Sequence, residues 1–295
     1  MENVPDLILL QQTLNEVENL SFLAQGGFKA VYKGTVQGRT EAIKVVFIPP
    51  ADIDSEEERS EIIGRVRREI EALNKCLSPH IVRLGSLLPQ LIQIDGRDYL
   101  IYSEEFLEGD NLRSKLKQAY KPNFRELKQL ATSLFEAIQV LKAQDLIHRD
   151  IKPDNIIALQ DQARPFVILD LGIAFKLHGS ALTRNPMYRP GTLPYMAPEM
   201  FNPRFRETLD FRSDLYSAGV TLYEYASGTH PIVKRGEDDY TTMYRILNTT
   251  PVSLASHRSD LPKDFCITVD QLIKKLPALR PSAIQTLLKK LEVIS

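Results

Sequence analysis

The stretch from position 148 to position 155 constrains this chain more than any other part of it. It reads His-Arg-Asp-Ile-Lys-Pro-Asp-Asn, and an Asp-Leu-Gly triplet begins at position 170, fifteen residues after the stretch ends. Together they supply a proton acceptor, a cation and two oxygen-bearing metal ligands: Asp150, Lys152, Asn155 and Asp170. Phosphoryl transfer needs such a set, because metal and lysine neutralise the triphosphate while an acceptor hydroxyl is oriented toward the γ-phosphorus. The alternative, a polar turn before a strand, would require neither this order of residues nor this spacing.

Length and composition indicate a globular protein. The chain has 295 residues, of which 43% are hydrophobic and 25% are charged, and it is long enough to bury a core. The formal net charge of -1 argues against a broad nucleic-acid or membrane surface. No apolar run approaches the roughly 18 residues of a membrane span, and the acidic start is unlike a basic secretory leader. Cys76 and Cys266 show no metal-ligand spacing, so we expect reduced thiols in a cytoplasmic protein.

The first hundred residues are predicted to be mostly strands. Apolar and β-branched residues lead from 20–23 into two hairpins, 30–47 and 87–103. The turns are predicted at Gln37-Gly38 and Asp95-Gly96, because each pair provides a residue that tolerates a positive φ.

The remaining pattern is helical. Between the hairpins, apolar residues recur at helical spacing over 55–77, which predicts one amphipathic helix. From Asn111 onward, a long helix is predicted at 124–141 and an apolar one at 214–228, with several more toward Leu291. The chain is therefore predicted to be α+β, with a small β-rich lobe that holds one helix and a larger, mainly helical lobe.

Two features of the first part are ambiguous when taken alone. The run Leu23-Ala24-Gln25-Gly26-Gly27-Phe28-Lys29-Ala30-Val31 lies between two strands, and its glycine pair could simply form a β-turn. Lys44 lies in the apolar strand Ala42-Ile43-Lys44-Val45-Val46, where it could point to solvent.

Taken together, these stretches resemble the motifs of the eukaryotic-type (Hanks-type) Ser/Thr protein kinase family. Two later segments strengthen the resemblance, Gly-Thr-Leu-Pro-Tyr-Met-Ala-Pro-Glu at 191–199 and Leu-Arg-Pro-Ser at 279–282. It implies a bilobal protein-kinase-like fold joined near Glu105–Gly109. The expected boundaries are an N-terminal extension at 1–19 and a kinase domain at 20–290, with an N-lobe at about 20–106 and a C-lobe at about 107–290.

The resemblance implies ATP as the nucleotide. Lys44 would bind the α- and β-phosphates and pair with Glu69, with Glu71 as the nearby competitor. Backbone groups of Glu105 and Leu107 would bind the adenine edge. The other residues implied at the nucleotide are Leu23, Ala24, Gln25, Gly26, Gly27, Phe28, Val31 and Ala42.

The resemblance also implies roles for the second motif. Asp150 would be the base or orienter of the acceptor hydroxyl, and Lys152 would steady the γ-phosphate. Asn155 and Asp170 would hold Mg²⁺. The substrate would be a protein with a Ser or Thr acceptor.

Three positions depart from the family pattern. Ala24 and Lys29 occupy the outer two glycine positions of the Gly-rich loop, and a Cβ limits how closely backbone approaches phosphate. Glu104 falls at the back of the adenine pocket, where an apolar residue is usual. A buried carboxylate there needs a partner or a water.

Other motif residues are implied to stabilise the larger lobe. Glu199 would form a buried ion pair with Arg280, and Asp214 would accept hydrogen bonds from the backbone of the catalytic loop. His148 would brace that loop through its ring or backbone.

Regulation is expected within the segment that precedes residue 199. The segment is basic from Lys176 to Arg189, so a phosphate there could pair with Arg149 and neighbouring cations. The candidate sites are Ser180, Thr183, Tyr188 and Thr192. A regulatory partner is the other expected source of control.

Two alternatives to an active protein kinase follow from the same residues. The altered Gly-rich loop and Glu104 favour a nucleotide-binding pseudokinase that acts as a scaffold. A phosphotransferase for small molecules on a related fold is the other, although the 191–199 segment, which holds peptide in the family, argues against it.

Overall fold

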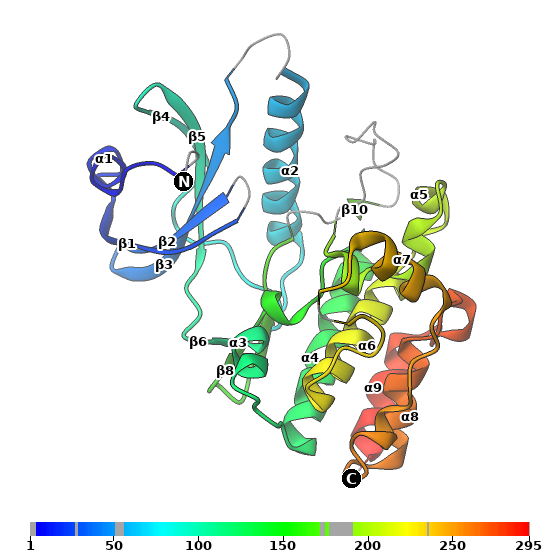
Figure 1. Cartoon of the computed structure of the whole chain (residues 1–295). Helices are drawn as coiled ribbons and strands as arrows, with labels where there is room; N and C mark the ends of the chain where they lie inside the picture. The colour runs from blue at the N-terminus through cyan, green and yellow to red at the C-terminus, as the bar shows by residue number, and fades with distance from the viewer. Residues whose placement is uncertain are drawn as a thin grey trace. The chain divides into compact units, whose positions relative to one another are not determined.

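The computed structural model describes residues 4–26, 29–50, 56–171, 175–176, 191–234 and 236–294 (Figure 1). The chain divides into two compact units. The first unit comprises Met1–Asn74 and Val82–Glu108, and the second comprises Lys75–Ile81 and Gly109–Ser295. The first is built on a sheet and the second is mainly helical, which confirms the predicted α+β class.

The first unit is a five-stranded antiparallel sheet in the order β1-β2-β3-β5-β4. Its strands are β1 (Val17–Gln25), β2 (Lys29–Val36), β3 (Arg39–Ile48), β4 (Gln90–Ile94) and β5 (Arg97–Glu105). The two predicted hairpins are confirmed. Gln37 and Gly38 have φ of 50° and 76°, and Asp95 and Gly96 have φ of 48° and 71°. Two successive positive φ values match the right-handed twist of the flanking strands.

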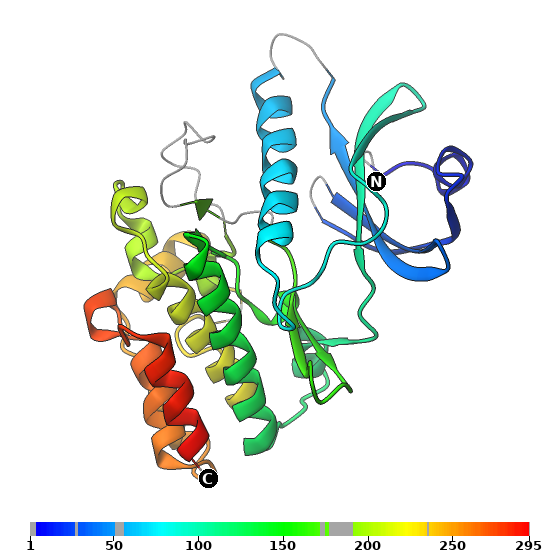
Figure 2. The same cartoon turned by 180° about the vertical axis from the view of Figure 1, so that it is seen from behind.

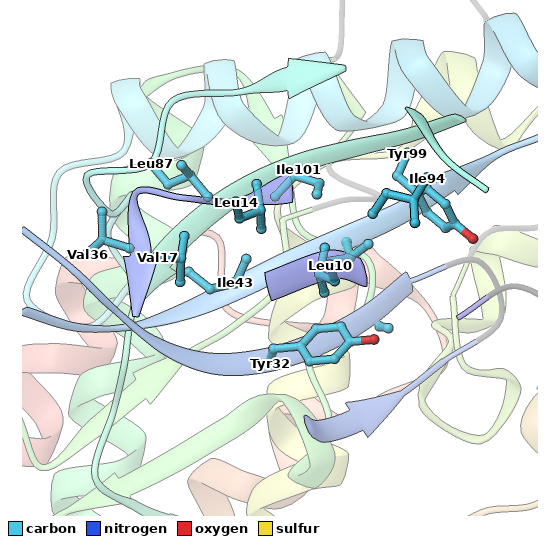
Figure 3. Packing of buried hydrophobic residues seen from close by; sticks show 12 residues of the cluster. Leu10, Leu14, Val17, Tyr32, Val36, Ile43, Leu87, Ile94, Tyr99 and Ile101 are labelled. Atoms are coloured by element: carbon cyan, nitrogen blue, oxygen red, sulfur yellow. The ribbon is translucent and has the colours of Figure 1, made fainter. Parts of the chain in front are cut away.

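One face of this sheet carries a core cluster that includes the N-terminal helix α1 (Leu7–Thr13). Asp6 caps α1 by accepting from the backbone of Ile8 and Leu9. Figure 3 shows Leu10 and Leu14 among the strand side chains of the cluster. Leu10, Leu14 and Val17, which fall within the N-terminal extension expected at 1–19, are therefore part of the first unit's packing.

The other face packs against α2 (Glu56–Lys75), which runs alongside the sheet in Figure 2. Ile62 and Val66 of the helix contact Val46, Leu100 and Tyr102 of the strands. The apolar stripe read from the sequence is the surface that α2 buries, so the predicted helix is confirmed.

The second unit consists of helices with short strands between them (Figure 1). Its α-helices are α3 (Leu112–Lys117), α4 (Phe124–Ala143), α5 (Phe205–Thr208), α6 (Arg212–Ser227), α7 (Asp239–Asn248), α8 (Lys263–Leu272) and α9 (Ile284–Val293). Its strands are β6 (Gly109–Asn111), β7 (Leu146–Ile147), β8 (Ile156–Leu159), β9 (Phe166–Ile168) and β10 (Phe175–Lys176). Its 3-10 helices are η1 (Pro153–Asn155), η2 (Leu193–Tyr195), η3 (Pro198–Phe201), η4 (Leu254–Ser256) and η5 (Pro277–Leu279).

Helix α6 is the centre of the second unit, with contacts to α4 and α8, and it is buried along almost its whole length. At Gly219 an added Cβ would lie 2.6 Å from Leu272 Cβ, so only glycine allows α8 to approach this closely. The helix ends at Gly228, whose φ of 76° is the left-handed conformation that glycine adopts without strain.

The predicted ion pair between Glu199 and Arg280 is present. Arg280 Nη1 and Nη2 lie 2.6 Å and 2.7 Å from the two carboxylate oxygens, and the arginine side chain is fully buried. This bidentate geometry ties η3 to the segment that follows η5. None of the described helices combines the length and the apolar character needed to cross a bilayer.

Candidate active site

The loop after β7 is held in place by Asp214, in the first turn of α6. The backbone N–H groups of His148 and Arg149 donate to its two carboxylate oxygens at 2.8 Å and 2.9 Å. Complete burial raises the pKa of Asp214, and the charges and N–H donors of His148 and Arg149 oppose that rise. Arg149 has a φ of 68°, a conformation that costs a non-glycine residue energy and therefore needs this support. The predicted role of Asp214 is confirmed.

The ring of His148 braces the same loop. Asp150 N donates to His148 Nδ1 at 3.3 Å, so Nδ1 is the acceptor and Nε2 carries the proton. Nε2 lies 3.2 Å from the carbonyl oxygen of Leu169, to which it donates. The loop is thereby joined to the residue that precedes Asp170.

The carboxylate of Asp150 accepts hydrogen bonds from several polar groups of the second unit. Its Oδ1 accepts from Thr192 Oγ1 at 2.7 Å and from Thr192 N at 3.0 Å. Its Oδ2 accepts from Lys152 Nζ at 2.8 Å and from Asn155 Nδ2 at 2.9 Å. Lys152 also donates to Thr192 Oγ1. Lys152 and Asn155, which the sequence singled out, therefore converge on the carboxylate of Asp150 together with Thr192.

Asn155 and Asp170 offer oxygen ligands from adjacent strand ends. Asn155 O accepts from Leu169 N at 2.8 Å, and Ile156 pairs with Ile168, so the two segments run side by side. The Asn155 amide nitrogen is committed to Asp150, so its carbonyl oxygen is the group that could ligate a metal. Asp170 has a φ of 65°. One carboxylate and one amide oxygen fit Mg²⁺, which takes hard oxygen ligands and keeps several waters or phosphates.

In the first unit, Lys44 lies on the sheet face that packs against α2. It pairs in register with Val31 on β2 and with Tyr102 on β5, while Ala42 pairs with Glu104. Antiparallel partners share a face, so Lys44 and Glu104 are diagonal neighbours on it. Lys44 Nζ lies 2.9 Å from Glu104 Oε2, with side chains only 8% and 1% exposed. The buried partner that Glu104 was expected to need is Lys44.

The expected pair between Lys44 and Glu69 is replaced by a different one. Glu69 Oε1 lies 3.4 Å from Lys29 Nζ, and the two side chains are 3% and 24% exposed. Glu69 is buried on the inner side of α2 whereas Glu71 is exposed, so burial distinguishes the two candidate carboxylates. The sequence identified the inward carboxylate but assigned it the wrong lysine, because Glu104 lies on the same sheet face as Lys44.

The remaining nucleotide candidates lie along the first three strands and the end of β5. Gly26 N donates to Lys29 O at 2.8 Å and closes the turn between β1 and β2; Gly27 and Phe28 lie outside the described residues. The half-buried Val31 and Ala42 share the face of Lys44. The backbone N–H of Glu105 donates to Arg83 O at 3.0 Å, and Leu107 follows β5 as a half-buried residue. Leu23, Ala24 and Gln25 belong to β1.

Comparison with known proteins agrees with this geometry. A protein family model described as the protein kinase domain matches residues 17–291. The chain belongs to the protein kinase family. It is 29% identical to a protein named as a probable serine/threonine-protein kinase PknB of Bifidobacterium longum, over 82% of this chain and 34% of that protein. It is 29% identical to serine/threonine-protein kinase A of Synechocystis, over 78% and 44% of the two chains, and 27% identical to serine/threonine-protein kinase ppk11 of Schizosaccharomyces pombe, over 91% and 79%.

The match thus spans about a third to a half of the length of several relatives, and the rest of those proteins says nothing about this chain.

Within the family pattern, the segment at 191–199 begins beside the catalytic loop. Gly191 has a φ of 134°, and an added Cβ would lie 2.9 Å from Arg149 O. Glycine therefore lets Thr192 reach Asp150. The other candidate phosphorylation sites, Ser180, Thr183 and Tyr188, lie outside the described residues.

A cavity of about 990 Å³ lies in the second unit of this kinase fold, and of its lining the sequence had pointed to peptide binding only in the 191–199 segment. Thr192 and Asp154 belong to its wall, so the cavity extends to the side chains that are hydrogen-bonded to Asp150. Arg113, near the start of α3, donates to Glu224 Oε1 at 2.8 Å and to Asp154 Oδ2 at 3.2 Å, and also bonds Tyr195 OH. A carboxylate at 224, within the mostly apolar run 220–226 of α6, was the signal for a buried partner.

Proposed function

We propose that this chain is a Ser/Thr protein kinase, which transfers the γ-phosphoryl group of Mg-ATP to a protein hydroxyl. The observation that carries the proposal is the Asp150 carboxylate, which collects Lys152, Asn155 and Thr192 within hydrogen-bond distance. The backbone that supports it is fixed by Asp214. Positioning and electrostatics supply most of the catalysis in phosphoryl transfer, and this network provides both.

Asp150 orients the acceptor. Thr192 Oγ1 lies 2.7 Å from Asp150 Oδ1, which is the hydrogen-bond distance that a substrate hydroxyl would have to adopt there. Asp150 then takes the proton as the hydroxyl oxygen attacks the γ-phosphorus, the bond from that phosphorus to the β–γ bridging oxygen breaks, and ADP leaves. Lys152, held 2.8 Å from Asp150 Oδ2, places its positive charge next to the transferred group.

Asn155 and Asp170 hold Mg²⁺ in this proposal. When bound, the ion neutralises the charge that the phosphate oxygens carry during transfer. The bond between Asn155 Nδ2 and Asp150 orients the amide so that its oxygen is available to the metal.

Residues of the first unit hold the nucleotide. The β1–β2 turn from Leu23 to Val31 would meet the phosphates, and the backbone of Glu105 and Leu107 would meet the adenine edge. The family places Lys44 at the α- and β-phosphates, and Lys29 is a second lysine on the same sheet face.

The cavity beside Thr192 takes the substrate chain on either side of the acceptor. Its wall includes residues 192–195, part of the segment that holds peptide in the family, which disfavours the small-molecule alternative. Glu224 and Asp154 are already paired with Arg113 and Glu237 with Arg245, so the exposed Asp239 is the one carboxylate of the wall without a cation among the described residues, and an exposed carboxylate binds a basic residue weakly. We therefore propose protein substrates without a required flanking arginine.

Control by phosphorylation between residues 173 and 192 belongs to the same proposal. Mass spectrometry of active protein is expected to find phosphate on Ser180, Thr183 or Thr192, and its absence from the whole segment would contradict this part. A cytoplasmic setting is proposed as well, because both free thiols are buried and fit a reducing compartment.

The first experiment is phosphate transfer from labelled ATP with Mg²⁺ onto a generic basic protein and onto the chain itself. Transfer to Ser or Thr that disappears in Asp150→Asn is the expected result. No transfer, together with retained ATP binding, would instead support the pseudokinase scaffold, which the buried pairing of Lys44 with Glu104 favours.

A further inference from the structure

We infer that Lys29, carried by the Gly-rich turn, is the lysine that Glu69 anchors at the ATP phosphates, and that Glu104 holds Lys44 away from this role. The inference rests on the proposed kinase function and departs from the lysine that the family pattern selects. Its basis is the way two lysines divide two carboxylates within the first unit. Lys29 Nζ lies 3.4 Å from Glu69 Oε1, and Lys44 Nζ lies 2.9 Å from Glu104 Oε2.

The sheet register makes this exchange of partners feasible. Lys29 pairs with Val46 and Val31 pairs with Lys44, so both lysines point from the same face of adjacent strands. That face packs against α2, which presents Glu69 as a buried carboxylate. Both lysines belong to the surface that Glu69 faces, and the presence of Glu104 determines which of them pairs with Glu69.

Burial explains why Lys44 stays with Glu104. The Glu104 side chain is 1% exposed, and its Oε1 is buried without a hydrogen-bond partner among the described residues. If Lys44 moved to Glu69, Glu104 would lose the cation that compensates its charge in a nearly dry site, which is strongly unfavourable. The departure from the family at position 104 therefore removes Lys44 from the contact with Glu69.

Lys29 is placed to act in its stead. Its carbonyl oxygen accepts from Gly26 N at 2.8 Å, so the residue belongs to the turn that is proposed to meet the phosphates. Its side chain is 24% exposed compared with 8% for Lys44, so a phosphate oxygen can reach its ammonium more readily. A cation at the third glycine position supplies charge where the usual glycine supplies only backbone N–H groups.

The test compares Lys29→Met with Lys33→Met, a matched control on the same strand and face that lies over the Phe106 ring. Lys29→Met is expected to lower kcat/KM for ATP by about 100-fold or more, and Lys33→Met to stay within about threefold. Lys29→Arg is expected to recover part of the loss. Activity of Lys29→Met within threefold of wild type would overturn the inference.

Two double variants test the part of Glu104. Lys29→Met/Glu104→Met releases Lys44 to reach Glu69, and it is expected to regain at least about tenfold over Lys29→Met. No recovery would contradict the claim that Glu104 withholds Lys44. Lys44→Met/Glu104→Met removes the buried pair together, and it is expected to lose less activity than Lys29→Met; the reverse order would also overturn the inference.

Failure of the inference is distinguishable from failure of the proposed function. If wild-type protein transfers no phosphate, the proposed function fails, and the affinity for a fluorescent ATP analogue still tests Lys29. Weaker binding of the analogue by Lys29→Met but not by Lys33→Met supports the phosphate contact. Equal affinity in both variants rejects it.

Discussion

The catalytic loop of the second unit and the lysine site of the first unit both pair carboxylates with lysines, but the two arrangements differ. Around Asp150, one carboxylate collects several donors, two of them from the same eight-residue stretch. Around Lys44 and Lys29, two carboxylates from different elements divide two cations. The loop therefore tolerates few substitutions without losing its shape. In the lysine site, by contrast, the two lysines can exchange carboxylate partners without any change in net charge.

The difference has a physical origin in the backbone. Asp214 fixes the loop through two N–H groups, and backbone bonds do not depend on which side chains compete nearby. In the first unit, the sheet register fixes only which residues share a face, and long side chains then choose among neighbours about 7–8 Å apart. Variants of the two regions should consequently fail in different ways.

The largest effect is expected for Asp214→Ala. The variant leaves the N–H groups of His148 and Arg149 buried without an acceptor, at about 1–3 kcal/mol each. A loop displaced by about an ångström should also lower kcat by about 100-fold. Asp214→Asn keeps one acceptor and is expected to fall between wild type and Ala in urea denaturation and in kcat. Wild-type stability of Asp214→Ala would contradict the backbone account of this region.

A smaller and reversible effect is expected in the first unit. Lys44→Met leaves Glu104 buried without its cation and should reduce the free energy of unfolding by about 3–5 kcal/mol. Lys44→Met/Glu104→Met should return to within about 1 kcal/mol of wild type, because an apolar pair can replace a buried ion pair. The chain has no tryptophan, so far-UV circular dichroism is the appropriate signal for the urea titration. A double variant as unstable as Lys44→Met would show that the loss of stability does not come from the uncompensated charge of Glu104 alone.

The same contrast explains what the sequence could predict. The hairpin turns, the stripe of α2 and the Asp150 set were predictable because each is determined by residues close together in the chain. The partner of Lys44 was not, since Glu104 is 60 positions away, and its effect depends on the register between β3 and β5. Arg113 and Glu224 were missed for the same reason: they are 111 residues apart and meet only after α3 and α6 are in place.

The cavity wall offers a pH-dependent test within the second unit. His230 Nδ1 accepts from the backbone N–H groups of Ile232 and Val233, and Nε2 lies 3.1 Å from Pro194 O. Burial lowers the pKa of His230 from 6.5 to about 4, although Glu224 opposes the shift. A proton on Nδ1 would break both bonds to the backbone.

The sign of this effect follows from the lowered pKa. Between pH 6.5 and about 4 the unfolded chain binds the proton and the folded chain does not, so stability from the neutral ring is complete above pH 6.5. It is lost as the pH falls toward 4, by up to about 3 kcal/mol. In His230→Asn the amide oxygen can accept in place of Nδ1, so the difference from wild type should shrink across this range. A constant difference between the two proteins would reject the assignment.

The smallest effect concerns substrate preference and would sharpen the contrast between fixed and exchangeable partners. Arg113→Ala frees Glu224 and Asp154 on the cavity wall, so peptides with an arginine near the acceptor should gain about five- to tenfold in kcat/KM relative to their alanine counterparts, or about 1 kcal/mol. Lys117→Ala changes another cation of the same wall and should leave the preference as it is. If Arg113→Ala and wild type have the same ratio of kcat/KM between arginine and alanine peptides, these carboxylates do not bind the basic residue of the substrate. A gain for arginine peptides would show that an internal side chain occupies the place that a basic substrate residue could take.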